Sequence, residues 1–438
     1  MKKLYTIFSL LLAALLLLGV TGCGKKPADP ASASSGGAAP SSAGSGSRPS
    51  PEPSDAQPEP SAPARSPTDC DSRFRLGQTA SVTEWDGVFY FLVGEYVGYY
   101  DEASGESGIL CGRPECTHED WTCNAYMNDN AKSLFWYDGK LYWMGFDQQY
   151  LHVKGVPANR GIWRMEPDGT GRELLKLLPD EIKKLAVASV TFHRGNAYLL
   201  VREERVTDGV PESLFWIYRT KLDRSEEFTP LLCRSEGLLY QVVDHYIYIA
   251  AHADPGDRDT PPHNVEISRY DLDTGEEELL LSPENAVNIT AGCFCVTDDQ
   301  TVYVADWNTN THTDMLYRLE NGRLEPIPGT KDETGTYSVW FLAGELAYRN
   351  HQNEDGSLTV WVSDLDGKTL FCGVSPQDFR GDDAGPTPLP VARTFLGGEK
   401  HFFLVYYMGI ADRKGCVVRY DVLPEGLSET DLWSMTGR

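Results

Sequence analysis

One short element recurs seven times along most of the chain, and it limits the folds that the chain can adopt. Each copy is a turn-like polar pair followed by a dense run of aromatic and aliphatic residues, as in 85–91 (WDGVFYF). The copies occupy 85–91, 137–143, 193–199, 243–249, 299–305, 343–348 and 397–403. Their spacing runs from the mid-forties to the mid-fifties, which is the length of a unit of four short strands. We therefore expect one repeat domain.

A second element, an apolar strand with a tight turn and another strand, follows the copies. Asp-Gly at 168–169 and Thr-Gly at 274–275 separate such strands, and this pairing is typical of hairpins because Gly tolerates a positive φ. The apolar runs are continuous, which indicates strands that are covered on both faces. The pattern predicts an all-β fold, a β-propeller of seven four-stranded blades, with six or eight blades as alternatives. Short helices are expected only at 179–185 and 428–435.

Three segments carry a resemblance to a known repeat. The segments 302–307 (VYVADW) and 141–145 (LYWMG) look like degenerate copies of one strand, and 164–170 (RMEPDGT) looks like the hairpin that follows it. Together they resemble YWTD-type propeller repeats and the related, uncharacterised propeller lipoproteins of Gram-positive bacteria. The resemblance covers most of residues 79–425, and it implies a fold without implying a reaction.

The N-terminus has the pattern of a secretory signal. Lys2 and Lys3 precede an uncharged apolar run over 4–20, and 20–23 (VTGC) resembles the lipobox of bacterial lipoproteins. That resemblance implies that 1–22 is a signal peptide and that Cys23 is diacylated, with chains such as palmitate. The lipid would hold the protein at the extracytoplasmic face of the bacterial cell membrane. An ordinary signal peptide or a spanning anchor is the alternative, although the run is short for a spanning helix of about 20 residues.

Residues 24–68 consist almost only of Ser, Ala, Pro and Gly. This composition predicts that 23–68 is a lipidated, disordered tether and that 69–438 is the propeller domain. Basic and acidic residues of the tether cancel, so losing Lys2 and Lys3 takes the formal net charge from −25 to −27, all on 69–438. This acidity excludes a basic nucleic-acid-binding surface and favours a neutral or cationic partner. We expect a monomer.

Long connections are expected on one face of the propeller, where second strands lead into third strands. They cover 146–159, 203–213, 252–264, 306–314 and 350–357. This face holds the candidate ligand-binding residues His152, His252, His263, Asp306, Trp307, His312 and His351, and His118 is expected there too. Such a group could bind a metal or a polar ligand at the mouth of the central channel. The alternative is that polar residues simply lie in loops.

The most specific local motif is a cluster of cysteines and one histidine within 111–123. Cys111, Cys116, His118 and Cys123 could hold zinc, because three thiolates and one imidazole satisfy a tetrahedral site. The rival interpretations are a disulfide between Cys116 and Cys123, and free thiols. The Cys-x-His-x4-Cys spacing also resembles a stretch of the propeller lipoproteins. Cys293 and Cys295 alternate along a predicted strand and are expected to be small buried residues.

Two functions follow from these patterns. The first is a non-catalytic lipoprotein whose propeller presents its loop face to a protein, glycan or small ligand. The second is a surface glycoside hydrolase or polysaccharide lyase with acid and base among Asp254, Asp257, Asp259, Asp306 and Glu354. The sequence contains no nucleophile elbow, phosphate loop or His-Glu-x-x-His motif. We therefore favour the binding platform, with zinc as the one cofactor that the sequence suggests.

Overall fold

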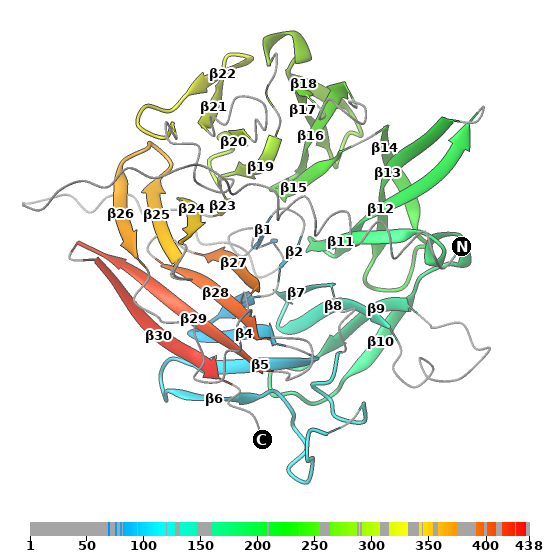
Figure 1. Cartoon of the computed structure of the whole chain (residues 1–438). Coiled ribbons are helices and arrows are strands. Elements are labelled where there is room, and N and C mark those ends of the chain that lie inside the picture. Colours follow the sequence, from blue (N-terminus) through cyan, green and yellow to red (C-terminus); the bar gives the residue numbers. More distant parts are fainter. Residues whose placement is uncertain are drawn as a thin grey trace, which may run out of the picture. The chain divides into compact units, whose positions relative to one another are not determined.

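The computed structural model in Figure 1 shows a β-propeller. It describes residues 69–434 apart from 71–74, 77–78, 81, 94, 120, 128–131, 147–159, 208–209, 236, 255–262, 287–288, 290, 307–314, 332–340, 344, 354–357, 375–390, 398–400, 409–413 and 425. Cys23, the predicted signal peptide and the predicted tether therefore lie outside the described residues. None of the helices in the described ranges is long and apolar enough to cross a bilayer.

Each of the seven blades is a four-stranded antiparallel sheet of consecutive strands. Blade 1 consists of β3 (Val82–Trp85), β4 (Val88–Val93), β5 (Tyr96–Asp101) and β6 (Glu106–Ile109). Blade 2 consists of β7 (Lys132–Tyr137), β8 (Lys140–Phe146), β9 (Arg160–Met165) and β10 (Glu173–Leu177). Blade 3 consists of β11 (Ala186–His193), β12 (Asn196–Thr207), β13 (Val210–Lys221) and β14 (Thr229–Ser235). Blades 4 and 5 consist of β15 (Leu239–Val243), β16 (Tyr246–Asp254), β17 (His263–Asp271) and β18 (Glu277–Leu281); β19 (Ala291–Val296), β20 (Val302–Asp306), β21 (Leu316–Glu320) and β22 (Arg323–Pro326). Blades 6 and 7 consist of β23 (Phe341–Ala343), β24 (Leu346–Gln352), β25 (Leu358–Asp364) and β26 (Thr369–Val374); β27 (Val391–Gly397), β28 (His401–Met408), β29 (Lys414–Leu423) and β30 (Gly426–Ser434).

The seven predicted repeats are thus confirmed as seven blades. The first strand of each blade lies nearest the centre and the fourth lies at the outer edge (Figure 1). In blades 1 to 4 the polar pair of the repeat forms the two-residue turn between the first two strands. In blades 1 to 4 the first residue of this turn has a positive φ, at Asp86, Asp138, Arg194 and Asp244. Two-residue turns of this kind match the twist of the strands they join.

Two expectations about local structure are wrong, and one is confirmed. The helix at 179–185 is α3 (Asp180–Lys183), and the described residues also contain a short 3-10 helix, η2 (Pro283–Asn285). Residues 428–435 do not form a helix, because β30 completes blade 7 and buries Leu432 fully. The expected loop 203–213 is largely the paired ends of β12 and β13, where Arg205 donates to Glu212 across the strands at 2.7 Å.

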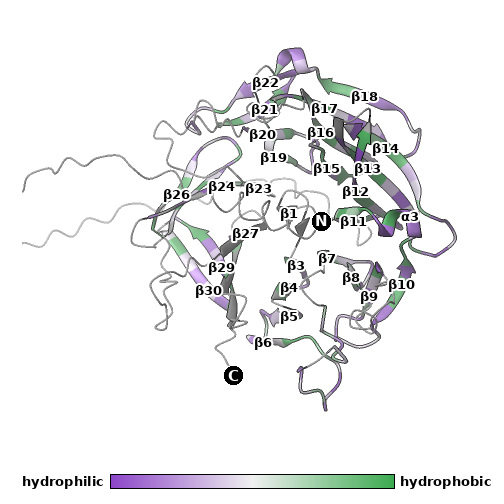
Figure 2. Ribbon diagram, turned by 45° about the vertical axis from the view of Figure 1, so that its right-hand side comes forward, coloured by the Kyte–Doolittle hydropathy of each residue, from purple (hydrophilic) through white to green (hydrophobic). Residues whose placement is uncertain are grey.

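The hydrophobic core lies between the blades. A separate cluster fills each interface between neighbouring blades, including the one between blades 7 and 1. Cys293 and Cys295 are buried in the cluster between blades 5 and 6, as the sequence predicted. Figure 2 shows hydrophilic residues in α3 and on turns at the outer edge. Burial on both faces explains the continuous apolar runs of the repeat.

A two-stranded sheet of β1 (Arg75–Leu76) and β2 (Thr79–Ala80) precedes blade 1. β1 contacts β23 and β27, and β2 contacts β7 and β11, all of which are first strands of blades. Figure 1 accordingly shows both strands at the centre of the propeller. The described chain begins just before them, at Asp69 and Cys70, which contact His193 and Arg194 of blade 3.

Candidate metal centre

The cysteine cluster lies in the connection from blade 1 to blade 2, over residues 110–127, which we call the rim loop. The loop follows β6, the outermost strand of blade 1, and Figure 1 shows it at the outer edge of the propeller. It pairs with the start of β5: the Val97 N–H donates to the Ala125 carbonyl at 2.9 Å, and Tyr126 forms a bridge with Tyr96. His118 therefore lies at the rim, not among the loops of the other candidate histidines.

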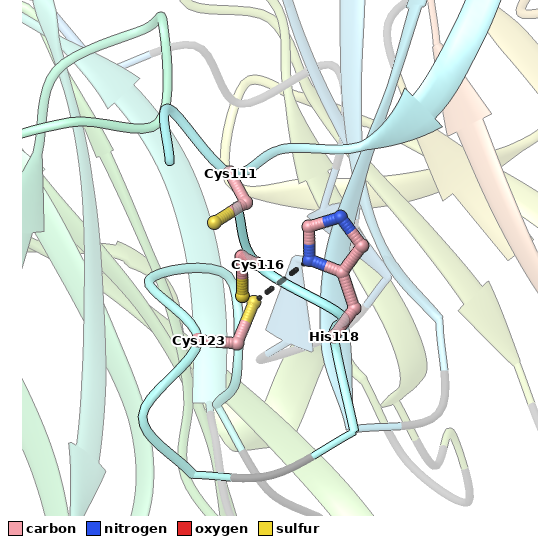
Figure 3. A group of neighbouring side chains, drawn as sticks. All are labelled: Cys111, Cys116, His118 and Cys123. Atoms are coloured by element: carbon pink, nitrogen blue, oxygen red, sulfur yellow. Dashed lines mark hydrogen bonds between the residues drawn. The ribbon is translucent and has the colours of Figure 1, made fainter. Parts of the chain in front are cut away.

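The rim loop brings four donor atoms together. The sulfurs of Cys111, Cys116 and Cys123 and a ring nitrogen of His118 all lie within 4.8 Å of one another (Figure 3). His118 Nδ1 is 3.3 Å from Cys123 Sγ. A tetrahedral site with metal–sulfur bonds of about 2.3 Å places its sulfurs about 3.8 Å apart. Small side-chain movements would therefore complete the coordination geometry.

Local hydrogen bonds hold these residues in place. A turn from Arg113 to Cys116 is closed by a 3.0 Å bond from the Cys116 N–H to the Arg113 carbonyl. His118 has a φ of 58°, which is uncommon outside glycine. The Tyr96 hydroxyl donates to the His118 carbonyl at 2.7 Å and supports this conformation. Cys123 is fully buried beside Tyr96 and Ala125, so the loop has only a small core of its own.

Blade 2 forms the other wall of the site. The carbonyl of Gly169, in the turn between β9 and β10, accepts the Gly112 N–H at 3.1 Å and the Asn124 Nδ2 at 2.9 Å. Arg172 donates to the Cys123 carbonyl at 3.0 Å. The rim loop is thus held to both blades. The sequence identified 168–169 as a hairpin turn, but no sequence signal linked Gly169, Asn124 or Arg172 to the cluster.

The pKa values of the Cys111 and Cys123 thiols depend on burial and on the neighbouring thiols. Burial raises the pKa of the Cys123 thiol to about 12, and the nearby Cys111 adds to the rise. Burial also acts to raise the pKa of Cys111. Backbone hydrogen bonds from Arg113 and Asn124, together with the other two thiols, outweigh burial and lower that pKa from its usual value. Burial thus opposes ionisation of the Cys123 thiol, and a divalent cation would favour its thiolate form.

The donor set fits zinc in a structural role. Four protein ligands of sulfur and nitrogen type close the coordination sphere, whereas a catalytic zinc keeps one position open. Cys116 and Cys123 carry separate thiols in this structure. Among the described residues, this is the one group of three or more His, Cys, Asp and Glu side chains close enough for a metal.

The other candidate ligand residues that the structure describes lie on second and third strands of blades 4, 5 and 6. His252 lies in β16 opposite Val265, and His263 begins β17 opposite Asp254, so both belong to an extended hairpin instead of a loop. Asp306 ends β20 and is buried, and His351 lies in β24. His152, Trp307, His312, Asp257, Asp259 and Glu354 lie outside the described residues. A ligand site on this face stays a prediction.

Comparison with known proteins shows a likeness of fold. No protein-family model and no curated protein sequence matches the chain. The chain is similar to the acylaminoacyl peptidase of Pyrococcus horikoshii, at 11% identity over 82% of this chain and 53% of the peptidase, with a TM-score of 0.46. It thus spans about half the length of the acylaminoacyl peptidases that it matches.

Two further solved structures are similar at the same level. An ulvan lyase, which is a polysaccharide lyase, is 13% identical over 82% of this chain and 97% of the lyase, with a TM-score of 0.44. The β-propeller domain of the trilobed protease from Pyrococcus furiosus is 12% identical over 83% of this chain and 100% of that domain, with a TM-score of 0.45. At such identities the likeness concerns the fold alone, and no activity is transferred from it.

Proposed function

We propose that this protein is a zinc-stabilised propeller that serves as a non-catalytic binding platform. The observation that carries the zinc assignment is the convergence of three thiols and one imidazole within 4.8 Å in the rim loop. Because the site is closed by four protein ligands, the metal would stabilise the seam between blades 1 and 2 without touching a substrate. Zinc also replaces the hydrophobic core that so short a loop lacks.

Metal analysis of the purified full chain, with thiol counting on the same sample, tests the zinc site. We expect one zinc per chain and no loss of thiols. His118→Ala and Cys123→Ser should carry almost no zinc, because each removes one of four ligands. Cys372→Ser is the matched control, since Cys372 is an exposed thiol of β26 outside the cluster. A stoichiometric disulfide between Cys116 and Cys123, with no bound metal, would contradict the assignment.

The binding role is supported by the architecture and by the absence of catalytic motifs from the sequence. Long connections join the second strand to the third in blades 2, 4 and 5, and such connections on a stable scaffold are the usual place for recognition. The acidity of residues 69–438 favours neutral or cationic partners, such as uncharged glycans or basic peptides. Nucleic acid is disfavoured for the same reason.

A ligand panel with the full chain distinguishes binding from turnover. We expect retention of a neutral or cationic ligand without bond cleavage. Release of reducing sugar from a polysaccharide, lost in Asp306→Asn, would instead support the hydrolase or lyase alternative and contradict the platform. Sedimentation of the same sample checks the expected monomer.

We further propose that Cys23 is lipidated and holds the platform at the extracytoplasmic face of the bacterial cell membrane. The support is the basic start, the apolar run over 4–20 and the small residues before Cys23. In bacteria fed a labelled fatty acid, the protein should carry the label and fractionate with membranes. Cys23→Ser should abolish both properties, and a label that persists in this variant would refute the anchor.

A further inference from the structure

The start of the described chain, Asp69 and Cys70, is held on blade 3 by two residues that also bind blade 4. Asp69 Oδ1 accepts from Arg194 Nε at 2.8 Å, and Arg194 Nη2 donates to Asp244 Oδ1 at 2.6 Å. Arg194 belongs to the β11–β12 turn of blade 3, and Asp244 to the β15–β16 turn of blade 4. Next to this chain of charges the Cys70 N–H donates to His193 Nδ1 at 2.8 Å. We call these five residues the N-terminal clamp.

Both ring nitrogens of the neutral His193 imidazole have a hydrogen-bond partner. Its Nδ1 accepts the Cys70 N–H, and its Nε2 is 2.5 Å from the Asp244 carbonyl oxygen. The proton must therefore lie on Nε2, which donates to that oxygen. A second proton would turn Nδ1 into a donor that faces the Cys70 N–H. Protonation would therefore remove the acceptor that holds the chain at Cys70.

The surroundings of His193 oppose that second proton. His193 is 1% exposed, and burial is the largest cause that lowers its pKa. The carboxylates of Asp69 and Asp244 act in the opposite direction, but both are paired with the Arg194 guanidinium. His245 is paired with Asp244 at 2.9 Å, and the Tyr137 hydroxyl from blade 2 accepts the Gly195 N–H. No further charged partner of His193 is found among the described residues of these elements.

We propose that the N-terminal clamp is a pH-sensitive attachment, which holds the start of the propeller chain at neutral pH and releases it on acidification. The direction of the pH dependence follows because the neutral form of the His193 imidazole accepts the Cys70 N–H. Because the pKa of His193 is lowered in the folded protein, its contribution to the stability of the attached state is complete above the ordinary histidine pKa of about 6.5. The contribution is lost as the pH falls through the lowered pKa of His193. Release frees Asp69 and Cys70 from blade 3 and exposes the Cys70 thiol, which is buried in the cluster between blades 2 and 3.

Thiol labelling of the full chain measures this release directly. Cys70 is 8% exposed, Cys372 is exposed, and Cys293 is 2% exposed within blade 5. Pulses with a methanethiosulfonate reagent at pH 7.5 and at pH 5.0, read by mass spectrometry, give the labelling of Cys70 relative to Cys372. We expect this ratio to rise about tenfold at the lower pH, because acidification should make the released state of Asp69 and Cys70 about ten times more populated. Cys293 should stay protected, which shows that the propeller remains folded.

Two variants separate the clamp from a general effect of acid. In His193→Gln the amide can accept from Cys70 and donate to Asp244 but cannot gain a proton, so the ratio should stay low at both pH values. Asp69→Asn should raise the ratio about threefold at pH 7.5, because one charged contact is lost, and should keep the pH dependence. Asp180→Asn, at an exposed pair in α3, is the control and should match wild type.

Three results would overturn the clamp. The first is a Cys70 ratio in wild type that does not change between the two pH values. The second is an equal rise in His193→Gln. The third is labelling of Cys293 together with Cys70, which would mean global unfolding. If His193→Gln does not fold, the wild-type ratio and the Asp69→Asn arm still decide between the alternatives.

Discussion

At the scale of residues, the candidate metal site depends on side chains that are close in sequence and on one glycine that is distant in sequence. Cys111, Cys116, His118 and Cys123 span thirteen residues, so their pattern is visible in the sequence. Gly169 lies in the next blade, has a φ of 78°, and accepts two hydrogen bonds from the rim loop. Its role is visible only when the blades are placed side by side.

We expect Gly169→Ala to weaken both the fold and the metal site. A Cβ at this position would lie 2.7 Å from the Leu110 carbonyl oxygen and 2.8 Å from the Gly112 nitrogen, and the positive φ adds strain. Gly195→Ala is the matched control, because Gly195 has the same φ of 78° with nothing within 4 Å of its Cβ position. The strained φ costs about 1 kcal/mol in both variants, and overpacking adds about 2 kcal/mol in Gly169→Ala.

Urea unfolding and competition with a zinc chelator measure these two effects. Gly169→Ala should lower the free energy of unfolding more than Gly195→Ala and should also release zinc at a lower chelator concentration. Equal losses of stability in the two variants, with unchanged zinc affinity, would mean that the rim loop is not seated on the turn of blade 2.

At the scale of elements, neighbouring blades are joined by a few polar contacts in addition to their apolar cores. The Gly322 carbonyl in blade 5 accepts from Asn285 Nδ2 at 3.0 Å, as the Gly169 carbonyl does from Asn124. The rim loop therefore elaborates a contact that also occurs between blades 4 and 5. The sequence predicted the strands but not this contact, because an Asn near a Gly-containing turn has many possible partners.

Gln241 makes the strongest polar link that we find between blades 4 and 5 in the described residues. Its Nε2 donates to the Val296 carbonyl at 2.7 Å, and its Oε1 accepts the Val296 N–H at 2.9 Å. Because the site is buried, Gln241→Leu leaves both backbone groups of Val296 without these partners. We expect a loss of about 3 kcal/mol in the free energy of unfolding.

Asn285→Ala is the control for Gln241→Leu, since it also removes an amide contact between these blades but at an exposed position. It should cost less than about 1 kcal/mol in urea unfolding. A cost for Gln241→Leu as small as that of Asn285→Ala would show that the buried link adds little to blade packing.

At the scale of the whole propeller, the ring is closed without a strand shared between the first and last blades. Blade 1 and blade 7 are each built from consecutive strands. Their seam is filled by Val82, Phe89 and Phe91 of blade 1 against Phe403 and Val417 of blade 7. Among the described residues of this seam, packed side chains join the two blades.

Arg419 is the polar anchor of this seam, and its replacement should loosen the ring. It pairs with Glu102 of blade 1 at 2.9 Å, and its guanidinium lies 5.5 Å from the centre of the Phe89 ring. Arg419→Met keeps the apolar stem but loses both interactions, and we expect a loss of about 2 kcal/mol.

Arg318→Met is the matched control, because the more exposed Arg318 pairs across blades 5 and 6 with Asp366 at 3.3 Å. It should cost less than about 1 kcal/mol. Urea unfolding at low and high salt, with amide exchange of β3 and β29, reports the seam. If exchange in both strands is the same in Arg419→Met and in wild type, the ion pair does not hold the ring closed.

The sequence by itself determined the number and type of blades, because strand periodicity and turn chemistry are local and recur seven times. It also identified the four possible metal ligands, which lie close together in the chain. Two predictions made from local sequence are wrong because tertiary contacts decide the structure there. The helix expected at 428–435 is part of the outer strand of blade 7, and the loop expected at 203–213 extends a hairpin. Only the tertiary structure decided that His118 lies at the rim, that Gly169 and Arg172 support the cluster, and that Asp69 and Cys70 are held on blade 3. The contacts of Gly169, Arg172 and Cys70 join segments 45 or more residues apart, and those that place the rim loop on β5 join residues 28 and 30 apart. No local pattern specifies which distant turn a loop will meet.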